Sequence, residues 1–373
     1  MTSLAPVTGL DRGHPRHPLQ AESLRERVDT TLQEFLLLRS AALAEVAPEC
    51  VQIVDRITSM TSAGKRLRPA FLYWGWRGAG GENSQAAVNA AAALELFQAA
   101  ALIHDDLIDA SDLRRGMPAV HKQFEALHSQ QSWQGDEAAF GLAGAVLTGD
   151  LCLVWTEELF SASGLSAEQL GRARPMFDRM RTELLGGQYL DVLSQVAPQA
   201  DPLALVDRAL RVIKFKSAKY SVEHPLLIGA SAAGADDKLL AVYSEFGLAT
   251  GEAFQLRDDV LGVFGDPATT GKPAGDDLRE GKRTVLIGRT LQHSTPAQAE
   301  TVHRLLGNPD LDQDGVQTLR EIIVATGADT EIEKMIGAAI DRAEAALAGA
   351  DLAEGPAREV LTGLLVAATD RVQ

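Results

Sequence analysis

Four aspartates are crowded into one short stretch of the sequence, directly after an apolar run. In "LIHDDLIDASDLRRG" (residues 102–116) they are Asp105, Asp106, Asp109 and Asp112. On a helix, Asp105 and Asp109 lie on one face, where like charges repel unless a cation binds between them. A solvated acidic surface is the ordinary explanation of such a cluster, but the preceding "ALELFQAAALI" is apolar and indicates a buried helix. This context favours a bound cation.

A second acidic pair, Asp258 and Asp259, also ends an apolar helical run, in "FQLRDDVLGVFG". It follows Asp105 by 153 residues, so the two clusters belong to different helices. Two such helices facing each other across a cavity could hold hard divalent cations through carboxylate oxygens. Mg²⁺ is the expected ion, because it is usually bound by a few carboxylates together with substrate phosphates.

Basic residues are few in this acidic chain, yet they gather in clusters. The net charge of -16 argues against nucleic acid as a partner, because binding a phosphate backbone needs a basic surface. The basic clusters are "GKRLRP" (64–69), "LRRG" (113–116), Lys216 with Lys219, and the segment 272–283. Beside aspartates, such clusters predict clamps for diphosphate groups.

The elements that carry these residues are predicted to be helices throughout. Apolar residues recur at three- and four-residue steps in segments 23–46, 239–265 and 330–350. Hydrophobic residues make up 46% of the chain but aromatic residues only 5%, which favours an aliphatic core of close-packed helices. No break between the helical segments resembles a long flexible linker. We therefore predict an all-α fold, with a flexible tail over residues 1–20 and one large helical domain over residues 21–373.

The sequence does not predict a membrane protein. The most apolar window, residues 84–103, is long enough to span a bilayer, but it is mostly alanine and carries Asn89 and Glu95, so a buried helix fits better. The N-terminal tail has no apolar segment of the kind found in signal peptides. Cys50 and Cys152 lack metal-ligand spacing and are expected to be reduced thiols. We therefore expect a soluble, cytoplasmic protein with no membrane span.

Six motifs, in this order, resemble those of the trans-isoprenyl diphosphate synthases of the polyprenyl synthetase family, in particular bacterial geranylgeranyl diphosphate synthases. They are "GKRLRP", "IHDDLIDASDLRRG", "GQYLD", "KSAKY", "FQLRDD" and "GKPAGDDLREGKRT". One aspartate motif alone is weak evidence, whereas six in order are specific. The resemblance covers nearly everything from residue 21 onward. It implies a helical bundle of the isoprenoid synthase type with a central cavity.

The resemblance also implies an activity. Enzymes of this family condense isopentenyl diphosphate head to tail with an allylic diphosphate (dimethylallyl, geranyl or farnesyl), and about three Mg²⁺ ions with oxygen ligands assist them. They form homodimers. We therefore expect a Mg²⁺-dependent prenyltransferase that binds these two diphosphates and a second copy of the chain.

Residue by residue, the resemblance assigns two diphosphate sites to the cavity. The expected metal ligands are Asp105, Asp109 and Asp258, supported by Asp106 and Asp259. The residues expected to contact the allylic diphosphate are Arg114, Lys216, Ser217, Tyr220, Gln255, Lys272 and Lys282. Those expected to contact isopentenyl diphosphate are Gly64, Lys65, Arg68, Gln98 and Arg115. The expected catalytic residues are Asp105, Asp109, Asp258, Lys216 and Gln255, and Phe254 is expected to line the reacting centre.

Two positions depart from the family pattern. The third aspartate of the second acidic motif is replaced by Gly262, which removes one carboxylate from that side. Because an aspartate there would restore the pattern, we expect Gly262→Asp to be tolerated. A threonine of the family is replaced by Ser217, which keeps the hydroxyl group.

Side chains on the helix before Asp105 are expected to set the product length. The growing chain should run alongside this helix, one turn of which rises about 5 Å, comparable to one isoprene unit. Ala101 and Ala100, four and five residues before Asp105, leave space, whereas Phe97 could close the pocket roughly a turn deeper. The expected product is geranylgeranyl diphosphate, with farnesyl or longer polyprenyl diphosphates as alternatives. The alternative for Phe97 is a place in the core, with another helix forming the floor.

Two other classes of protein share some of these features. A class I terpene cyclase would share the helical fold and the first aspartate motif, but would replace Asp258 and Asp259 by an asparagine/serine/glutamate metal motif. A non-catalytic subunit of a heteromeric synthase would have lost aspartates and clamps that this sequence retains. His104 and His121 are expected to be structural, because the family implies that the departing diphosphate takes the proton.

Overall fold

The computed structural model describes residues 18–197, 201–265, 275–308 and 310–369. Within these ranges nearly all regular structure is helical, as predicted, and the strands form one short antiparallel hairpin. The elements in chain order are η1 (Pro18–Ser23), α1 (Leu24–Val46), η2 (Pro48–Cys50), α2 (Val51–Ser62), α3 (Leu67–Gly78), α4 (Gln85–Ile108), β1 (Leu113–Arg114), β2 (Met117–Pro118), α5 (Val120–Gln130), α6 (Glu137–Ser161), α7 (Ala167–Val196), α8 (Pro202–Val212), η3 (Ile213–Glu223), α9 (His224–Ala233), α10 (Asp237–Phe264), α12 (Asp276–Arg279), α13 (Val285–His293), α14 (Pro296–Leu305), α15 (Gln313–Thr326), α16 (Ala328–Ala348) and α17 (Ala357–Thr369). Most of the predicted tail, residues 1–17, lies outside the described residues.

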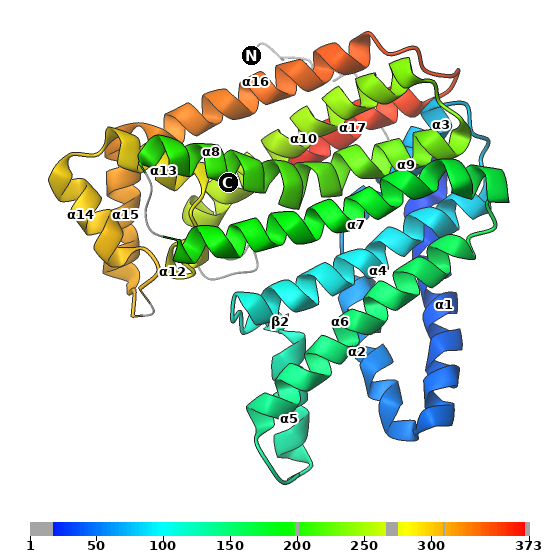
Figure 1. Ribbon diagram of the computed structural model, residues 1–373, viewed down its shortest axis with the longest axis horizontal. Helices are drawn as coiled ribbons and strands as arrows, with labels where there is room; N and C mark the ends of the chain where they lie inside the picture. Colours follow the sequence, from blue (N-terminus) through cyan, green and yellow to red (C-terminus); the bar gives the residue numbers. More distant parts are fainter. Residues whose placement is uncertain (1–17, 198–200, 266–274, 309, 370–373) are drawn as a thin grey trace, which may run out of the picture.

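The long helices form a bundle around α4. Figure 1 shows α7, α9, α10 and α16 running across the molecule in similar directions, with α14 and α15 at one end. The helices α1, α2, α5 and α6 extend below this layer (Figure 1). Packing contacts join α4 to α1, α2, α3 and α6, and join α10 to η3 and α16.

The core is aliphatic, as the composition predicts. At the start of α4, the Ser84 side chain accepts a hydrogen bond from the Ala86 backbone N–H and caps the helix. The alanines at positions 90–93 and Ala100 on α4 are buried. Because alanine side chains are short, neighbouring helices can pack close to α4 without leaving voids.

A second hydrophobic cluster is formed by α8, α13, α15, α16 and the C-terminal half of α10. The N-terminal half of α10 belongs to the first cluster, with Tyr243 and Phe246, whereas Leu256 and Val260 belong to the second. One continuous helix therefore connects both clusters and carries Asp258 in the half that belongs to the second cluster.

Two helices are long and apolar enough to cross a bilayer by length and composition, α4 and α6. The protein buries 72% of the most apolar window of α4, so the segment predicted as a buried helix is a core helix. For α6 the buried share is 33%. Its outer face exposes Leu142, Leu147 and Val154.

Between α8 and α9 the chain forms a π-helix, η3. Hydrogen bonds in a π-helix span five residues, and such turns are rare and concentrate at functional sites. Pro225 stands in the first turn of α9, directly after η3. The π-helix packs against α7 and α10 and carries Lys216, Ser217 and Tyr220 of the "KSAKY" motif.

Candidate active site

A cavity of about 730 Å³ lies between α3, α4, α7, η3 and α10. Residues of all six sequence motifs line it. The predicted site residues among them are Gly64, Lys65, Arg68, Gln98, Ala101, Asp105, Arg114, Arg115, Lys216, Ser217, Tyr220, Phe254, Gln255, Asp258, Asp259 and Lys282. Segments that are far apart in sequence therefore meet at one place.

Four predicted site residues within the described ranges are not on the wall of this cavity. A fifth predicted residue, Lys272, lies outside the described residues. Phe97 and Ala100 are buried, at 2% and 0% exposure, and Asp106 is also fully buried. Asp109 lies behind the wall, with its carboxylate 3.5 Å from the ammonium of Lys282.

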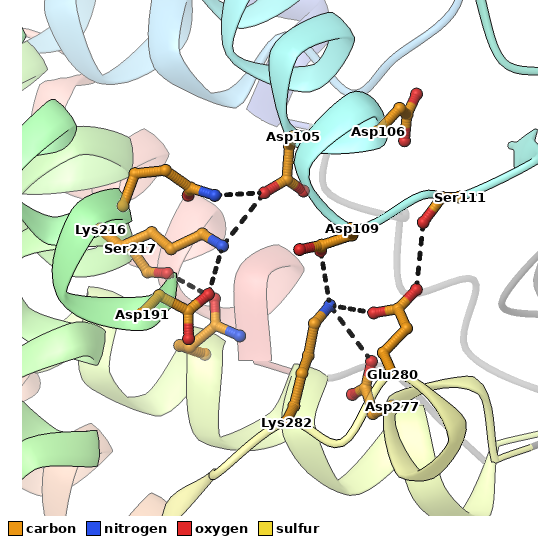
Figure 2. A network of polar contacts seen from close by, with 12 residues as sticks. Asp105, Asp106, Asp109, Ser111, Asp191, Lys216, Ser217, Asp277, Glu280 and Lys282 are labelled. Carbon is orange, nitrogen blue, oxygen red and sulfur yellow. Dashed lines mark hydrogen bonds and ion pairs between the residues drawn. The ribbon is translucent and has the colours of Figure 1, made fainter. Parts of the chain in front are cut away.

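Asp105 is surrounded by cationic and amide groups (Figure 2). Its Oδ1 accepts hydrogen bonds from Lys216 Nζ at 3.2 Å and from Gln188 Nε2 at 2.9 Å, and Arg114 Nη2 lies 3.5 Å from Oδ2. Burial disfavours the charged carboxylate, but Lys216, Lys282 and Arg114 outweigh it and lower the pKa of Asp105 to about 2. Asp105 is thus ionised at neutral pH, as metal binding requires.

Lys282 is the centre of a second group of carboxylates (Figure 2). Its Nζ lies 2.7 Å from Glu280 and 3.5 Å from both Asp109 and Asp277. Burial raises the pKa of Asp109 to about 6; Lys282 opposes this rise, and the charges of Asp105 and Glu280 add to it. Negative charge therefore exceeds positive charge around Lys282.

Asp106 and Asp259, the second aspartates of the two DD pairs, each bind another residue of the site. Arg114 pairs with the buried carboxylate of Asp106, with its Nε 2.8 Å from Oδ1. Gln255 Nε2 donates to Asp259 Oδ1 at 2.8 Å. Burial raises the pKa of Asp259 well above its usual range, although the Gln255 hydrogen bond opposes this. These contacts fit the supporting role predicted for Asp106 and Asp259.

A cationic cluster lies at another part of the cavity, around Arg115. Burial lowers the pKa of Arg115; Glu95 opposes this, and the charges of Arg114, Arg66 and Arg68 strengthen it. Arg115 thus lies near three other guanidinium groups, of which Arg114 is paired with Asp106 and Arg66 with Glu95 and Asp29. Such a cluster favours the binding of a polyanion.

Aromatic and amide groups adjoin this cluster. The Arg68 guanidinium lies 4.3 Å from the centroid of the Tyr220 ring, and its Nη2 donates to Ser221 Oγ at 2.7 Å. The Tyr220 hydroxyl donates to Gln98 Oε1 at 2.7 Å. Phe97 packs edge-on against the Tyr220 ring, with the centroids 5.5 Å apart. Phe97 therefore supports a wall residue from behind.

Helix α7 approaches the π-helix closely enough to orient Lys216. A Cβ added at Gly187 would stand 2.5 Å from the Lys216 backbone nitrogen, so only glycine permits this approach. The contact brings Asp191 Oδ2 to 2.7 Å from Lys216 Nζ. On the other side, Ser217 Oγ donates to Gln255 Oε1 at 2.6 Å. Ser217, which replaces the threonine of the family, therefore uses its hydroxyl group to bind Gln255.

The space beside Gly262 that a side chain would fill is occupied by the carboxylate of Asp277. A Cβ added at Gly262 would stand 1.8 Å from Asp277 Oδ2. Asp277, which lies in the short helix α12, thus covers the face of α10 from which the third aspartate of the motif would project. A side chain at position 262 would meet the Asp277 carboxylate unless that side chain moves, and this argues against the expectation that Gly262→Asp is tolerated.

Four residues of this site were not singled out from the sequence: Gln188, Asp191, Asp277 and Glu280. The first two belong to the "GQYLD" motif and stand three residues apart, on one face of α7. The other two belong to "GDDLREGK", where acidic residues alternate with basic ones. Their motifs were recognised, but their partners are set by tertiary contacts. Neither His104 nor His121 is among the residues that line the cavity.

The carboxylates suit Mg²⁺ as an open site rather than as a closed cage. Within the described ranges, no three carboxylate, histidine or cysteine side chains converge as a preformed metal site. Asp109 Oδ1 is buried and has no hydrogen-bond partner, so a cation would satisfy it. Mg²⁺ needs few protein ligands when substrate phosphates supply the others. The donor set therefore fits Mg²⁺ bound together with a diphosphate.

Comparison with known proteins gives the same picture. Residues 49–323 match the polyprenyl synthetase family. The geranylfarnesyl diphosphate synthase of Aeropyrum pernix is 31% identical over 316 residues, which cover 84% of this chain and 92% of that protein. The geranylgeranyl diphosphate synthase of Sulfolobus acidocaldarius is 32% identical over 265 residues, covering 70% and 74% of the two chains.

A solved structure is similar over almost the whole chain. It is the geranylgeranyl pyrophosphate synthase of Corynebacterium glutamicum, complexed with isoprenyl diphosphate and magnesium. The two chains are 40% identical with a TM-score of 0.89, and the match covers 94% of this chain and 99% of the other. The family match, the relatives and the shared fold agree with the motifs that meet in the cavity. The protein is therefore a prenyltransferase of the polyprenyl synthetase family, the trans-isoprenyl diphosphate synthases.

Proposed function

We propose that this enzyme condenses isopentenyl diphosphate with an allylic diphosphate in the cavity between α4 and α10, with Mg²⁺ as its cofactor. The observation that carries the proposal is that one cavity contains two separate cationic groups. One surrounds Asp105 through Lys216 and Arg114, and the other surrounds Arg115. A reaction between two diphosphates needs two such sites side by side.

The allylic diphosphate is assigned to the side with the aspartates. Arg114, Lys216 and Lys282 would bind its oxygens. The resemblance assigns the same role to Lys272, which is not among the described residues. Asp105, Asp109 and Asp258 would hold Mg²⁺, in a cluster of about three ions, against the same oxygens. The Corynebacterium glutamicum structure, which contains isoprenyl diphosphate and magnesium, supports this assignment.

Isopentenyl diphosphate is assigned to the guanidinium cluster. Lys65, Arg68 and Arg115 would bind its phosphates, while Gly64 allows the backbone to come close. Gln98 lines the same cavity and is fixed by the Tyr220 hydroxyl. Both substrates are thereby held with their carbon atoms in the same enclosed space.

The reaction follows from this arrangement. The allylic C–O bond breaks, and its electron pair leaves with the diphosphate while Lys216 and Arg114 stabilise the added negative charge. Bound Mg²⁺ supplies further positive charge to the leaving group. The double bond of isopentenyl diphosphate then attacks the allylic carbon, and the released diphosphate takes the proton that is lost. Ser217, Tyr220, Phe254 and Gln255 would line the carbocation and exclude water.

The proposed main product is geranylgeranyl diphosphate. Ala101 lines the cavity four residues before Asp105 and leaves that level open. Phe97 is buried against Tyr220, so it would limit chain growth from behind this ring rather than at the surface of the cavity. The relatives include both geranylgeranyl and geranylfarnesyl diphosphate synthases, and we assign the difference in product length to local side chains.

We also propose that a second copy of the chain covers the outer face of α6. Leu142, Leu147 and Val154 are exposed there, and most of the apolar window of this helix is uncovered. Asp150 lies between Leu147 and Val154, and its side chain is 59% exposed. A charge in the middle of this face is costly in a bilayer, which favours a protein partner. Leu147→Asp should therefore lower the molecular mass measured by light scattering from that of a dimer to that of a monomer.

The remaining proposals concern organisation and location. Residues 21–373 would form one domain, because α10 contributes to both hydrophobic clusters. A cytoplasmic location suits Cys50 and Cys152, which are free thiols in the structure.

One experiment tests the proposed reaction and its alternatives. The purified protein is incubated with Mg²⁺, isopentenyl diphosphate and each allylic primer in turn, and the products are dephosphorylated and separated by chromatography. Elongated prenyl alcohols are expected, and chelation of Mg²⁺ should abolish them. A cyclic hydrocarbon would indicate a terpene cyclase, and no turnover would indicate a non-catalytic subunit. Asp105→Ala and Asp258→Ala should each lower turnover by several orders of magnitude, because charge stabilisation is needed most as the leaving group departs.

A further inference from the structure

The segment before α3 is held by a buried charge network centred on Arg66. Arg66 is 3% exposed. Its Nε lies 2.7 Å from Asp29 Oδ1 on α1, and its Nη1 lies 2.6 Å from Glu95 Oε2 on α4. Its Nη2 donates to the Thr61 carbonyl near the end of α2. One guanidinium therefore ties three helices to the start of a fourth, and all three of its nitrogens are engaged.

This network borders the backbone of the isopentenyl diphosphate site. Arg66 has a φ of 54°, in the left-handed region that is unfavourable for a non-glycine residue, so tertiary contacts must hold it there. A Cβ added at Gly64 would lie 3.5 Å from Arg66 Nη1 and 3.6 Å from Arg115 Nη2. Arg115 Nη1 also donates to the Ala63 carbonyl at 2.7 Å. The two guanidinium groups therefore face the same short stretch of chain.

Glu95 makes Arg66 necessary. Its carboxylate lines the cavity at 7% exposure, beside a site that must receive a polyanion. In the present structure Arg66 neutralises this carboxylate through the short contact on Nη1. If Arg66 were removed, the buried charge of Glu95 would be uncompensated. Arg115 is a remaining cation on that wall, and Glu95 already favours its ionisation.

We propose that Arg66 is a positioning residue for isopentenyl diphosphate: by neutralising Glu95 it keeps Arg115 available to the substrate. Arg66 itself does not bind the substrate, because its nitrogens are already engaged. The proposal rests on the proposed function, since it assumes that Arg115 binds isopentenyl diphosphate. It differs from a general role in stability because it concerns one substrate of the two.

The test compares single and double substitutions in the full-length enzyme. Arg66→Met should raise KM for isopentenyl diphosphate on the order of 10- to 100-fold, the change expected for one lost charged hydrogen bond. The KM for the allylic substrate and kcat should stay within about threefold. Glu95→Gln alone should change neither KM by more than about threefold, because it removes the charge that competes for Arg115.

The double variant Arg66→Met/Glu95→Gln gives the deciding measurement. It should recover at least about tenfold of the KM for isopentenyl diphosphate lost in Arg66→Met, because no uncompensated carboxylate remains. If Arg66→Met does not fold, the double variant must still bind isopentenyl diphosphate within about fivefold of the wild type. A double variant no better than the single one would overturn the proposal. Where Arg66→Met does not fold, a double variant more than about fivefold from the wild type would overturn it as well.

A matched control lies on the same helix. Arg77 pairs with Glu22 at the far end of α3, away from the cavity. Arg77→Met should lower the melting temperature without changing either KM. An equal rise of both KM values in Arg66→Met, or a rise for Arg77→Met, would contradict the proposal. Turnover by the wild type is measured in the same assay, so a failure of the proposed reaction would be seen separately.

Discussion

The ammonium group of Lys216 lies 2.7 Å from Asp191 Oδ2, and this contact joins the π-helix to α7. The same ammonium group reaches Asp105 Oδ1 at 3.2 Å. Burial disfavours the charge on Lys216, but Asp105 and Asp191 outweigh it and raise its pKa above the usual value. If metal and diphosphate neutralise Asp105 as proposed, Asp191 would be the partner that keeps Lys216 charged and directed into the cavity.

Asp191→Asn should therefore weaken the use of the allylic substrate. The amide keeps the shape of the side chain but loses the charged hydrogen bond to Lys216, so kcat/KM for the allylic diphosphate should fall about 10- to 100-fold. Steady-state kinetics with each substrate varied in turn measure this. The matched control is Asp178→Asn, which breaks surface pairs with Arg174 and Arg181 on the same helix and should change kcat/KM by less than about twofold. Equal effects of the two substitutions would refute the role of Asp191.

The collision between positions 262 and 277 gives a second prediction. Gly262→Asp should lower the free energy of unfolding by about 1–3 kcal/mol, because the new side chain overlaps Asp277 and adds a like charge. Turnover should fall with it. Adding Asp277→Gly should restore both quantities in part, because it removes the overlapping side chain. Denaturant unfolding and turnover of the single and double variants check this, and a fully active, fully stable Gly262→Asp would show that Asp277 moves aside freely.

The third prediction concerns product length. Ala101→Phe places a ring on the cavity wall and should shift the main product to farnesyl diphosphate. Ala101→Ser, which adds one atom, should leave the product unchanged. Chromatography of the dephosphorylated products distinguishes these outcomes. If Ala101→Phe still makes the wild-type product, the growing chain does not pass this residue.

Phe97 should affect both stability and length. Its ring is 2% exposed and packs on Tyr220, so Phe97→Ala should cost about 3–5 kcal/mol in the free energy of unfolding. In the fraction that remains folded, the space behind Tyr220 should allow longer products. Thermal unfolding and product analysis measure the two effects. Loss of stability without any lengthening would place the floor of the cavity on another helix.

The part of the chain behind the site should make stability depend on pH. His224 is 1% exposed, and its Nε2 lies 2.9 Å from Glu183 Oε2. Burial lowers the pKa of His224, and the hydrogen bond to Glu183 only partly opposes this. Between the lowered pKa of the folded state and the ordinary pKa of about 6.5 in the unfolded state, the unfolded chain binds more protons. Stability from this group is therefore complete above about pH 6.5 and is lost as the pH falls.

Unfolding measured between neutral and mildly acidic pH checks the sign. His224→Gln should flatten the pH dependence by at most about 1.4 kcal/mol per pH unit, the slope that one proton gives. The control His303→Gln alters an exposed imidazole on α14 and should leave the slope unchanged. A slope that is the same in His224→Gln and the wild type would show that other groups cause it.

The sequence predicted features that depend on local patterns, and it did not predict features that depend on tertiary contacts. Helical periodicity is a local property, so the all-α fold and the buried segment around Ala90 were predictable. The meeting of Asp105, Lys216 and Arg115 in one cavity was predictable because all three belong to recognisable motifs. Asp191 and Asp277 act through tertiary contacts, the first through the approach permitted by Gly187. No local pattern reveals such contacts.

The π-helical form of residues 213–223 could not be predicted from the sequence either. Both kinds of helix place apolar residues at intervals of about four, and the choice between them depends on packing against α7 and α10. The sequence predicts a helix there, which is correct, but does not predict its width.

Because the π-helix is wider than an α-helix, the orientation of the side chains in this segment depends on its number of residues. Loss of one residue between Ile213 and Glu223 would let the chain close as an ordinary α-helix, and everything beyond the loss would turn by about 100° relative to what precedes it. Lys216 and Tyr220 would then point to different places, although every residue type in the motif was retained. Substitutions within the segment preserve the register, whereas insertions and deletions destroy it. Mutational tolerance here should therefore be high for amino-acid identity at outward-facing positions and almost nil for length.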